Sequence, residues 1–295
     1  MKSRKRISLV LTICMIAIML SACNGKETTN SNKQEMIDNN KKDVANNMPI
    51  SASEAFAQKG IWFYSDYSSG SSVPVTKDRI IYAVLVFDGN GNVTHYTTSY
   101  ENEFALVTSS EILRFGDLKD LSEKEILSLA KEQDKKIFEI DMQNKMAEVD
   151  EQIQNLQESL TKSYNQNVEL CQDWLNGASL VKGKIEETEY QEPEAHPFTL
   201  KIKTDGTGNQ TAEEKLIYSY ARLTSNDYTA PTTSEAELWK TTEIKEATIT
   251  LNPYGGNSTV YDMQFTGLGS INKLIEEGEP MLMLDTPDAK GVEVD

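Results

Sequence analysis

The chain has 295 residues, of which 38% are hydrophobic, and a net charge of −17 from 46 acidic and 29 basic side chains. This composition is sufficient for a folded core. The acidic balance excludes nucleic acid as an expected partner, because binding to nucleic acid requires basic patches.

The first 22 residues have the pattern of a signal peptide. A basic start is followed by an uncharged apolar run, Ile7 to Leu20, which is shorter than the about 20 residues that a membrane span needs. We therefore expect residues 1–22 to be removed. Their loss takes away four basic and no acidic residues and leaves a net charge of −21.

The residues at the end of this segment, Leu20-Ser21-Ala22-Cys23, resemble the lipobox of bacterial lipoproteins. The resemblance implies cleavage between Ala22 and Cys23 and a diacylglyceryl anchor, including palmitate, on the Cys23 thiol. Two or three acyl chains hold a protein stably in a membrane. The expected location is the outer face of the cytoplasmic membrane. With Cys14 removed and Cys23 lipidated, only Cys171 would remain as a thiol, so no internal disulfide framework is expected.

Residues 23–50 are interpreted as the lipidated cysteine and a flexible polar tether. The segment after Cys23 is rich in Asn and Lys and nearly free of aromatic residues, so it lacks the apolar surface needed to order itself.

Residues 51–118 predict a small N-terminal region that combines a helix with a β-hairpin. A capping box at 51–54 favours a helix over 52–59, and strands are expected over 61–64 and 79–88. The DGNGN sequence at 88–92 favours a hairpin turn.

The same DGNGN sequence has some likeness to a calcium-binding EF-hand loop, which is the alternative. That loop needs Gly at its sixth position and Glu at its twelfth, where this chain has Val93 and Ser99. A second turn of similar composition, at 205–209, is also expected to close a hairpin.

Residues 119–177 predict a long helix or a helix pair, because no Gly or Pro interrupts 121–176. A break or a bend is expected at 141–145, where the register of apolar residues shifts. Residues 146–175 carry a stripe at spacings of three and four that includes Ile153, Leu156 and Leu160. The stripe either packs on the rest of the chain or pairs with a protein partner or a second copy. Cys171 lies on the stripe and is expected to be buried.

Residues 178–295 predict a C-terminal antiparallel β-rich domain, a sandwich or a barrel. Short helices are expected at 234–240 and 271–277. The overall fold class is α+β, with antiparallel β-rich domains and a long helical segment between them. Strands are expected at 180–189, 198–204, 216–223, 243–251, 260–265 and 281–284.

Few residues suggest chemistry. The two histidines, His95 and His196, are not clustered with cysteines at metal-ligand spacing, so no metal and no cofactor is expected. No G-x-S-x-G nucleophile elbow occurs, and we expect no enzyme. An aromatic group forms either a ligand-binding surface or part of the core, and its members are Trp62, Tyr64, Tyr67 and Tyr96.

The chain is similar in outline to lipoproteins of Gram-positive bacteria whose activity is uncharacterised. The likeness lies in a lipobox, a tether, Gly60–Trp62, the hairpin Val86–Val93 and the helix Asp117–Lys131. The expected role is a non-enzymatic binding or interaction module at the cell surface. The alternatives are a transport-associated solute-binding lipoprotein and, third, a cell-wall-active hydrolase.

Overall fold

The computed structural model separates the chain into two compact units, Met1–Asp43 and Val44–Asp295. The described residues all belong to the second unit. Four predictions fall outside them: cleavage after Ala22, lipidation of Cys23, the tether up to residue 47, and a role for Tyr67. The structure describes residues 48–65, 74–99, 112–162, 167–224, 231–252, 257–276 and 279–295.

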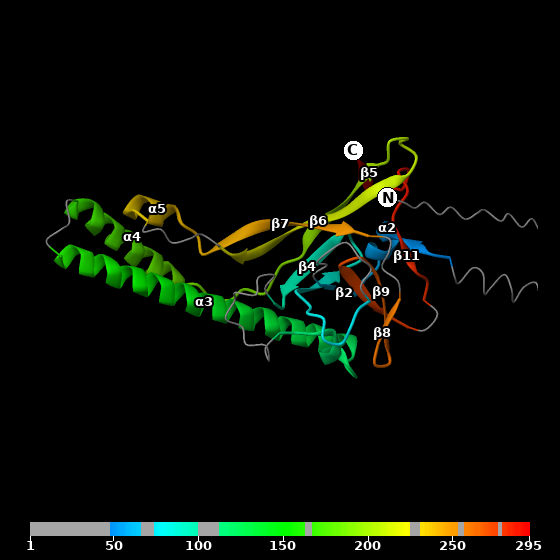
Figure 1. The fold of residues 1–295 in the computed structure, drawn as a ribbon, viewed down its shortest axis with the longest axis horizontal. Helices are drawn as coiled ribbons and strands as arrows, with labels where there is room; N and C mark the ends of the chain where they lie inside the picture. Colours follow the sequence, from blue (N-terminus) through cyan, green and yellow to red (C-terminus); the bar gives the residue numbers. More distant parts are fainter. Residues whose placement is uncertain are drawn as a thin grey trace, which may run out of the picture. The chain divides into compact units, whose positions relative to one another are not determined.

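The fold is α+β, as predicted, and its centre is one sheet (Figure 1). Among the described residues ten strands join in it, in the order β7-β6-β5-β4-β3-β2-β10-β9-β8, with β12 beside β5. Their bounds are β2 Gly60–Tyr64, β3 Ala83–Phe87, β4 Asn92–Thr97, β5 His196–Thr204, β6 Thr211–Leu223, β7 Thr242–Leu251, β8 Ser258–Val260, β9 Met263–Leu268, β10 Ile271–Ile275 and β12 Val292–Val294.

Strands from both ends of the chain meet in this sheet. The C-terminal strand β10 pairs antiparallel with β2, and β4 pairs with β5. The strands of the N-terminal and C-terminal regions are therefore continuous through backbone hydrogen bonds. A separate two-stranded sheet pairs β1 (Ile50–Ser51) in parallel with β11 (Leu282–Met283).

The helix predicted at 271–277 is wrong, because this segment forms the strand β10. Its position between β2 and β9 satisfies its backbone on both edges and buries Ile271, Asn272 and Ile275. Tertiary pairing overrides a weak local helical pattern here.

Both glycine-rich turns close hairpins, as predicted. In the first turn Asp88 accepts hydrogen bonds from the backbone N–H groups of Asn90, at 2.7 Å, and Asn92, at 3.1 Å. Gly89 and Gly91 have φ angles of 78° and 88°, which favour glycine. Asp205 stabilises the β5–β6 turn in the same way, because its carboxylate accepts hydrogen bonds from the backbone N–H and the hydroxyl of Thr207.

The sheet has a core on each face. On one face lies α2 (Ala52–Phe56), whose Phe56 ring stacks on Phe87 with centroids 4.8 Å apart and contacts Trp62 at 4.7 Å. On the other face the start of α3 (Glu123–Thr161) packs Ile126 and Ala130 against the sheet, next to a 3-10 turn at Phe115–Leu118. These two clusters and the sheet form what we call the sheet body.

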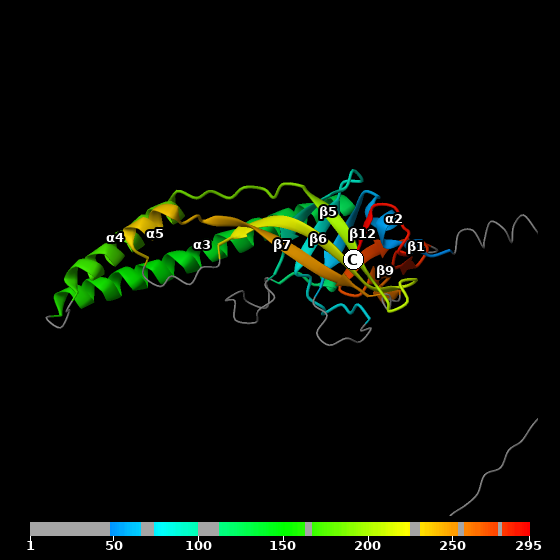
Figure 2. The ribbon, with the colours of Figure 1, turned by 90° about the horizontal axis from the view of Figure 1, so that it is seen from above.

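Beyond the sheet body, α3 pairs with α4 (Val168–Glu186), and α5 (Thr233–Leu238) packs on α4, as Figures 1 and 2 show. We call residues 142–161 of α3, together with α4 and α5, the helical arm. The break predicted at 141–145 is wrong: α3 is a single helix of 39 residues. The shift in apolar register instead marks the point where α3 leaves the sheet body and begins to pack on α4.

The strand predicted at 180–189 is also wrong, since α4 continues through Gly177 to Glu186. Gly177 does not end a helix. A Cβ atom at this position would lie 2.0 Å from the carbonyl oxygen of Pro231 and 2.8 Å from Thr232. The glycine therefore allows the segment before α5 to pack against α4.

Candidate interaction surface

The strands β6 and β7 extend beyond the rest of the sheet as a two-stranded ribbon. They pair from Glu214↔Leu251 to Leu223↔Thr242, whereas β5 pairs with β6 only as far as Tyr218. Figure 1 shows the ribbon running toward α5. β7 is the terminal strand of the sheet path, so within the described part of the chain its outer edge has no strand partner.

The hydrogen-bonding pattern decides which backbone groups this edge presents. The N–H of Thr224 donates to the carbonyl of Thr241 at 2.9 Å, which makes 224 and 241 a hydrogen-bonded pair. Such pairs alternate along an antiparallel ladder. The N–H and C=O groups of Thr242, Ile244 and Glu246 therefore point away from β6. An edge of this kind can accept another strand.

Two large apolar side chains lie exposed close to the edge. Leu238, at the end of α5, is 83% exposed and Ile244 on β7 is 63% exposed. Single exposed aliphatic residues are ordinary, but these two border the same cavity beside an unpaired strand.

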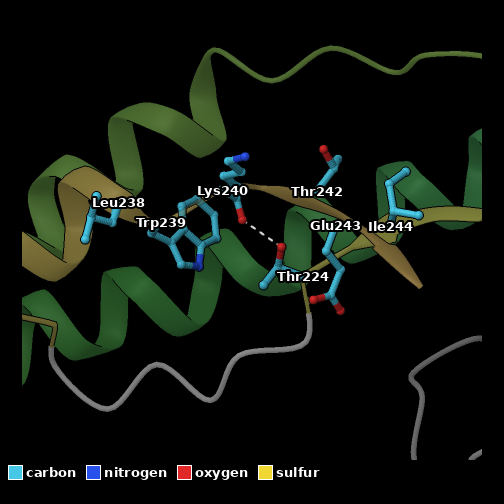
Figure 3. A pocket seen from close by; sticks show the side chains of 7 residues that line it. All are labelled: Thr224, Leu238, Trp239, Lys240, Thr242, Glu243 and Ile244. Carbon is cyan, nitrogen blue, oxygen red and sulfur yellow. Dashed lines mark hydrogen bonds between the residues drawn. The ribbon is translucent and has the colours of Figure 1, made fainter. Parts of the chain in front are cut away.

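The cavity has a volume of about 420 Å³ and opens to solvent between α5 and the ribbon (Figure 3). Its floor is fixed by Thr224, whose hydroxyl donates to the Lys240 carbonyl at 2.7 Å. The lining residues are Thr224, Leu238, Trp239, Lys240, Thr242, Glu243 and Ile244.

Polar contacts hold the two sides of this cavity in place. On α4, Lys184 Nζ donates to the carbonyls of Glu237, at 2.8 Å, and Trp239, at 2.7 Å, and so fixes the end of α5. On the ribbon, the Arg222 guanidinium binds the Glu243 carboxylate at 2.7 and 2.8 Å. Among the lining residues that the structure describes, the one carboxylate is thus already engaged.

A second cation lies between α3 and the ribbon. Lys145 Nζ donates to the carbonyl of Thr224, and burial lowers the pKa of this amine, against the opposing effect of Asp141. The contact joins the long helix directly to Thr224, the residue after β6 that lines the cavity.

A pair of buried carboxyl groups, Glu214 and Asp285, lies outside the cavity. There β6 contacts segments from near the start and near the end of the folded unit. Glu214 accepts from the Asp285 N–H at 2.8 Å, and Asp285 accepts from the N–H and hydroxyl of Ser53 at 2.7 and 2.5 Å. Burial is the largest cause that raises the pKa of Glu214, to about 8, and the side chain of Asp285 adds to this rise. Glu214 is 0% exposed and Asp285 is 2% exposed, so the pair ties chain segments together and does not face the cavity.

A third titratable group, Asp134 on α3, joins the helix to the sheet body. It accepts from the Thr97 N–H at 2.7 Å and from the Tyr190 hydroxyl at 2.8 Å. Burial raises the pKa of Asp134 to about 6. Both carboxylate oxygens of Asp134 are thus engaged by the fold, whereas Oε1 of Glu214 is buried without a hydrogen-bond partner among the described residues.

The predicted aromatic surface is not assembled as one face. Trp62 is 1% exposed in one core, and Tyr64 is half-buried at the edge of that core. Tyr96 is 5% exposed in the core on the opposite face, and its hydroxyl donates to Glu192 at 3.3 Å. The core alternative therefore describes Trp62 and Tyr96 correctly.

The two histidines are on strands. His95 stacks on Tyr220 with ring centroids 4.0 Å apart and shares a 2.9 Å hydrogen bond with Tyr218, and burial lowers the pKa of its imidazole to about 3. His196 lies at the start of β5, opposite Val93. No group of three or more metal-ligating side chains is present among the residues described.

The predicted helix interface packs within the chain. Leu156 is 9% exposed and lies against Cys171 and Ala178 of α4, and Ile153 and Leu160 border the same cluster. Cys171 is 3% exposed, which confirms its expected burial. Association with another chain through these three residues remains a prediction.

Sequence reasoning did not find Leu238 or Ile244. Ile244 is out of phase with the buried Ile249 of β7, and Leu238 lies only two residues from the buried Ala236 of α5. The strand and helix periods were therefore the signals that could have placed both side chains outside the core. In the part of the chain that the structure covers, no helix combines the length and the apolar character that crossing a membrane requires. Comparison with protein-family models, with curated proteins and with solved structures gives no match for this chain.

Proposed function

We propose that this protein is a lipid-anchored, extracytoplasmic interaction module, that it is not an enzyme, and that it docks a partner at the edge of β7. The observation that carries the docking role is the exposed pair Leu238 and Ile244 beside an unpaired strand edge. Anchoring rests on the Leu20–Cys23 sequence and its resemblance to a lipobox.

The chemistry of the cavity supports binding more than catalysis or solute capture. The only carboxylate among its described lining residues, Glu243, is neutralised by Arg222, and its walls include two aliphatic side chains and two threonines. The two carboxyl groups with the most strongly raised pKa values, on Glu214 and Asp134, are buried outside the cavity, and each accepts a structural hydrogen bond. A cavity open to solvent fits an extended chain segment better than an enclosed small molecule.

Site-specific photo-crosslinking tests the docking role in the membrane-anchored full chain. A photoreactive phenylalanine analogue replaces Leu238, and the matched control carries it at Tyr261, a 56% exposed residue on the turn between β8 and β9. We expect a discrete cross-linked species from position 238 and none from position 261. Equal labelling from both positions, or none from 238, would contradict the docking role.

The anchor has its own test. The Cys23→Ser variant should lose incorporation of labelled palmitate and move from the membrane fraction to the soluble fraction. Cys171→Ser is the control, because this thiol is buried and should not be acylated. Retention of label by Cys23→Ser would refute the anchor and leave the docking role to be judged on the cross-linking.

A further inference from the structure

The outer edge of β7 is complementary to itself in one register. The part of β7 that extends beyond β5 runs from 242 to 246 and includes Glu243, Ile244 and Lys245. Two antiparallel copies of this part can be aligned about a two-fold axis perpendicular to the sheet. This axis puts the same face of the sheet on the same side in both copies. Residues that pair across it must therefore be both even-numbered or both odd-numbered. This condition leaves only a few registers to compare.

Charge selects among these registers. Centring the axis on Ile244 places Glu243 of each copy opposite Lys245 of the other. A centre on Glu243 would oppose two carboxylates, and a centre on Lys245 would oppose two ammonium groups. Opposite charges stabilise a cross-strand pair and like charges destabilise it.

Both faces of the ribbon fit the Ile244-centred register. On one face, each Glu243 would lie between Arg222 of its own chain and Lys245 of the copy. On the other face, Ile244 lies beside the exposed Ala221 of β6, so the axis creates a continuous apolar row of two alanines and two isoleucines. The 63% exposed Ile244 becomes covered.

The backbone fits as well. The outward-facing N–H and C=O groups are those of the even-numbered residues, and this register pairs Ile244 with Ile244 and Thr242 with Glu246. These are the positions that exchange two hydrogen bonds in an antiparallel ladder. The edge can thus be completed without shifting the strand that is already formed.

We propose that two copies of this chain pair through the outer edges of β7, antiparallel and centred on Ile244, to form a homodimer with a continuous sheet. This inference rests on the proposed function, since it names the partner that docks at β7. Confinement of both copies to one membrane by the proposed anchor raises their effective concentration, so a small interface suffices.

Disulfide trapping in membranes containing the full chain tests the register. In Ile244→Cys the two thiols meet on the axis, where a hydrogen-bonded pair has Cα atoms about 5.5 Å apart, within the range for a disulfide. Thr248→Cys is the matched control: it is exposed on the same face of β7, but the register separates its two copies by eight residues, about 26 Å. We expect a disulfide-linked dimer from the first variant alone.

A charge change separates this register from random collision. Lys245→Glu, added to Ile244→Cys, opposes two carboxylates and should lower the yield of dimer severalfold. Lys124→Glu makes the same change in an exposed residue of the first turn of α3, outside β7, so it should leave the yield unchanged. Circular dichroism of each variant confirms that the fold is retained.

The outcomes are distinct for the two proposals. Equal trapping of Ile244→Cys and Thr248→Cys, or no effect of Lys245→Glu, overturns the dimer. A monomeric Ile244→Cys chain, combined with cross-linking of position 238 to a different protein, overturns the dimer and retains the docking role. Failure of both positions to react overturns both proposals.

Discussion

The sheet body and the helical arm are stabilised in different ways. The sheet body has two large cores, with aromatic side chains such as Phe56, Trp62 and Phe115 at 0–1% exposure. The arm has two small clusters, centred on Val149 and Leu156, and most of its charged residues are exposed. Stability should therefore be concentrated in the sheet body, while the arm, with less buried surface, should open locally at lower cost.

A tryptophan-to-alanine change in each region should give the largest contrast. Trp62→Ala removes a fully buried indole from the sheet core and should lower the free energy of unfolding by about 3–5 kcal/mol. Trp239→Ala removes an indole that is only partly buried against the arm cluster and should cost about half as much or less. Urea denaturation followed by circular dichroism measures both. Equal losses would show that the arm is as tightly packed as the sheet body.

The pH dependence of stability should also belong to the sheet body. Because the pKa of Glu214 rises from 4.5 to about 8 on folding, the folded state holds a proton that the unfolded state loses between those values. The contribution of Glu214 to the free energy of unfolding is therefore fully present below pH 4.5. It falls as pH rises toward 8 and does not change further above that pH. At about 1.4 kcal/mol per pKa unit, the total loss is a few kcal/mol.

The Glu214→Gln variant tests this directly, because the amide oxygen can still accept from the Asp285 N–H but cannot ionise. Denaturation midpoints from pH 4 to pH 9 should show a much flatter profile than the parent chain. Below pH 6 two groups oppose each other in the variant. Asp134, with a pKa of about 6, loses its contribution to stability as pH rises, whereas His95, whose pKa burial lowers to about 3, gains its contribution. An unchanged profile would remove Glu214 as the source.

The two regions also differ in how well the sequence predicts them. In the sheet body, local turn chemistry determined the hairpins: Asp88 and Asp205 organise their turns through neighbouring N–H groups, which depends only on nearby residues. The pairing of β10 with β2 connects positions more than 200 residues apart. No local pattern encodes such a contact, and the segment was predicted to be a helix.

In the arm, the sequence predicts the helices but not their ends. Gly177 was interpreted as a boundary, whereas its small size serves close packing against Pro231. The docking surface was missed for a related reason. Ile244 and Ile249 both lie in an apolar strand pattern, yet the first is 63% exposed and the second 4% exposed. The difference arises because the two residues point to opposite faces of β7: the even-numbered positions from 242 to 250 are all exposed, whereas the buried Ile249 is odd-numbered.

Gly177→Ala should show how closely the arm elements pack. The added methyl group would collide with the backbone of residues 231–232, so the segment before α5 must move. We expect a loss of about 1–3 kcal/mol, typical of overpacking, and faster hydrogen exchange in α5 with little change in the sheet. Protection unchanged in α5 would mean that the segment moves without cost.

The smallest effect, with the opposite sign, should come from Gly183→Ala on the same helix. A Cβ atom at 183 meets nothing within 4 Å outside its own helix, and the φ angle is negative, so the methyl group fits without strain. Alanine also loses less backbone entropy than glycine in a helix, and the gain should be about 0.5–1 kcal/mol. Thermal unfolding of the two variants side by side separates packing from propensity. If both alanines destabilise the arm, helix propensity is not limiting there, and the approach of α5 to α4 at Gly177 is not the reason for the first loss.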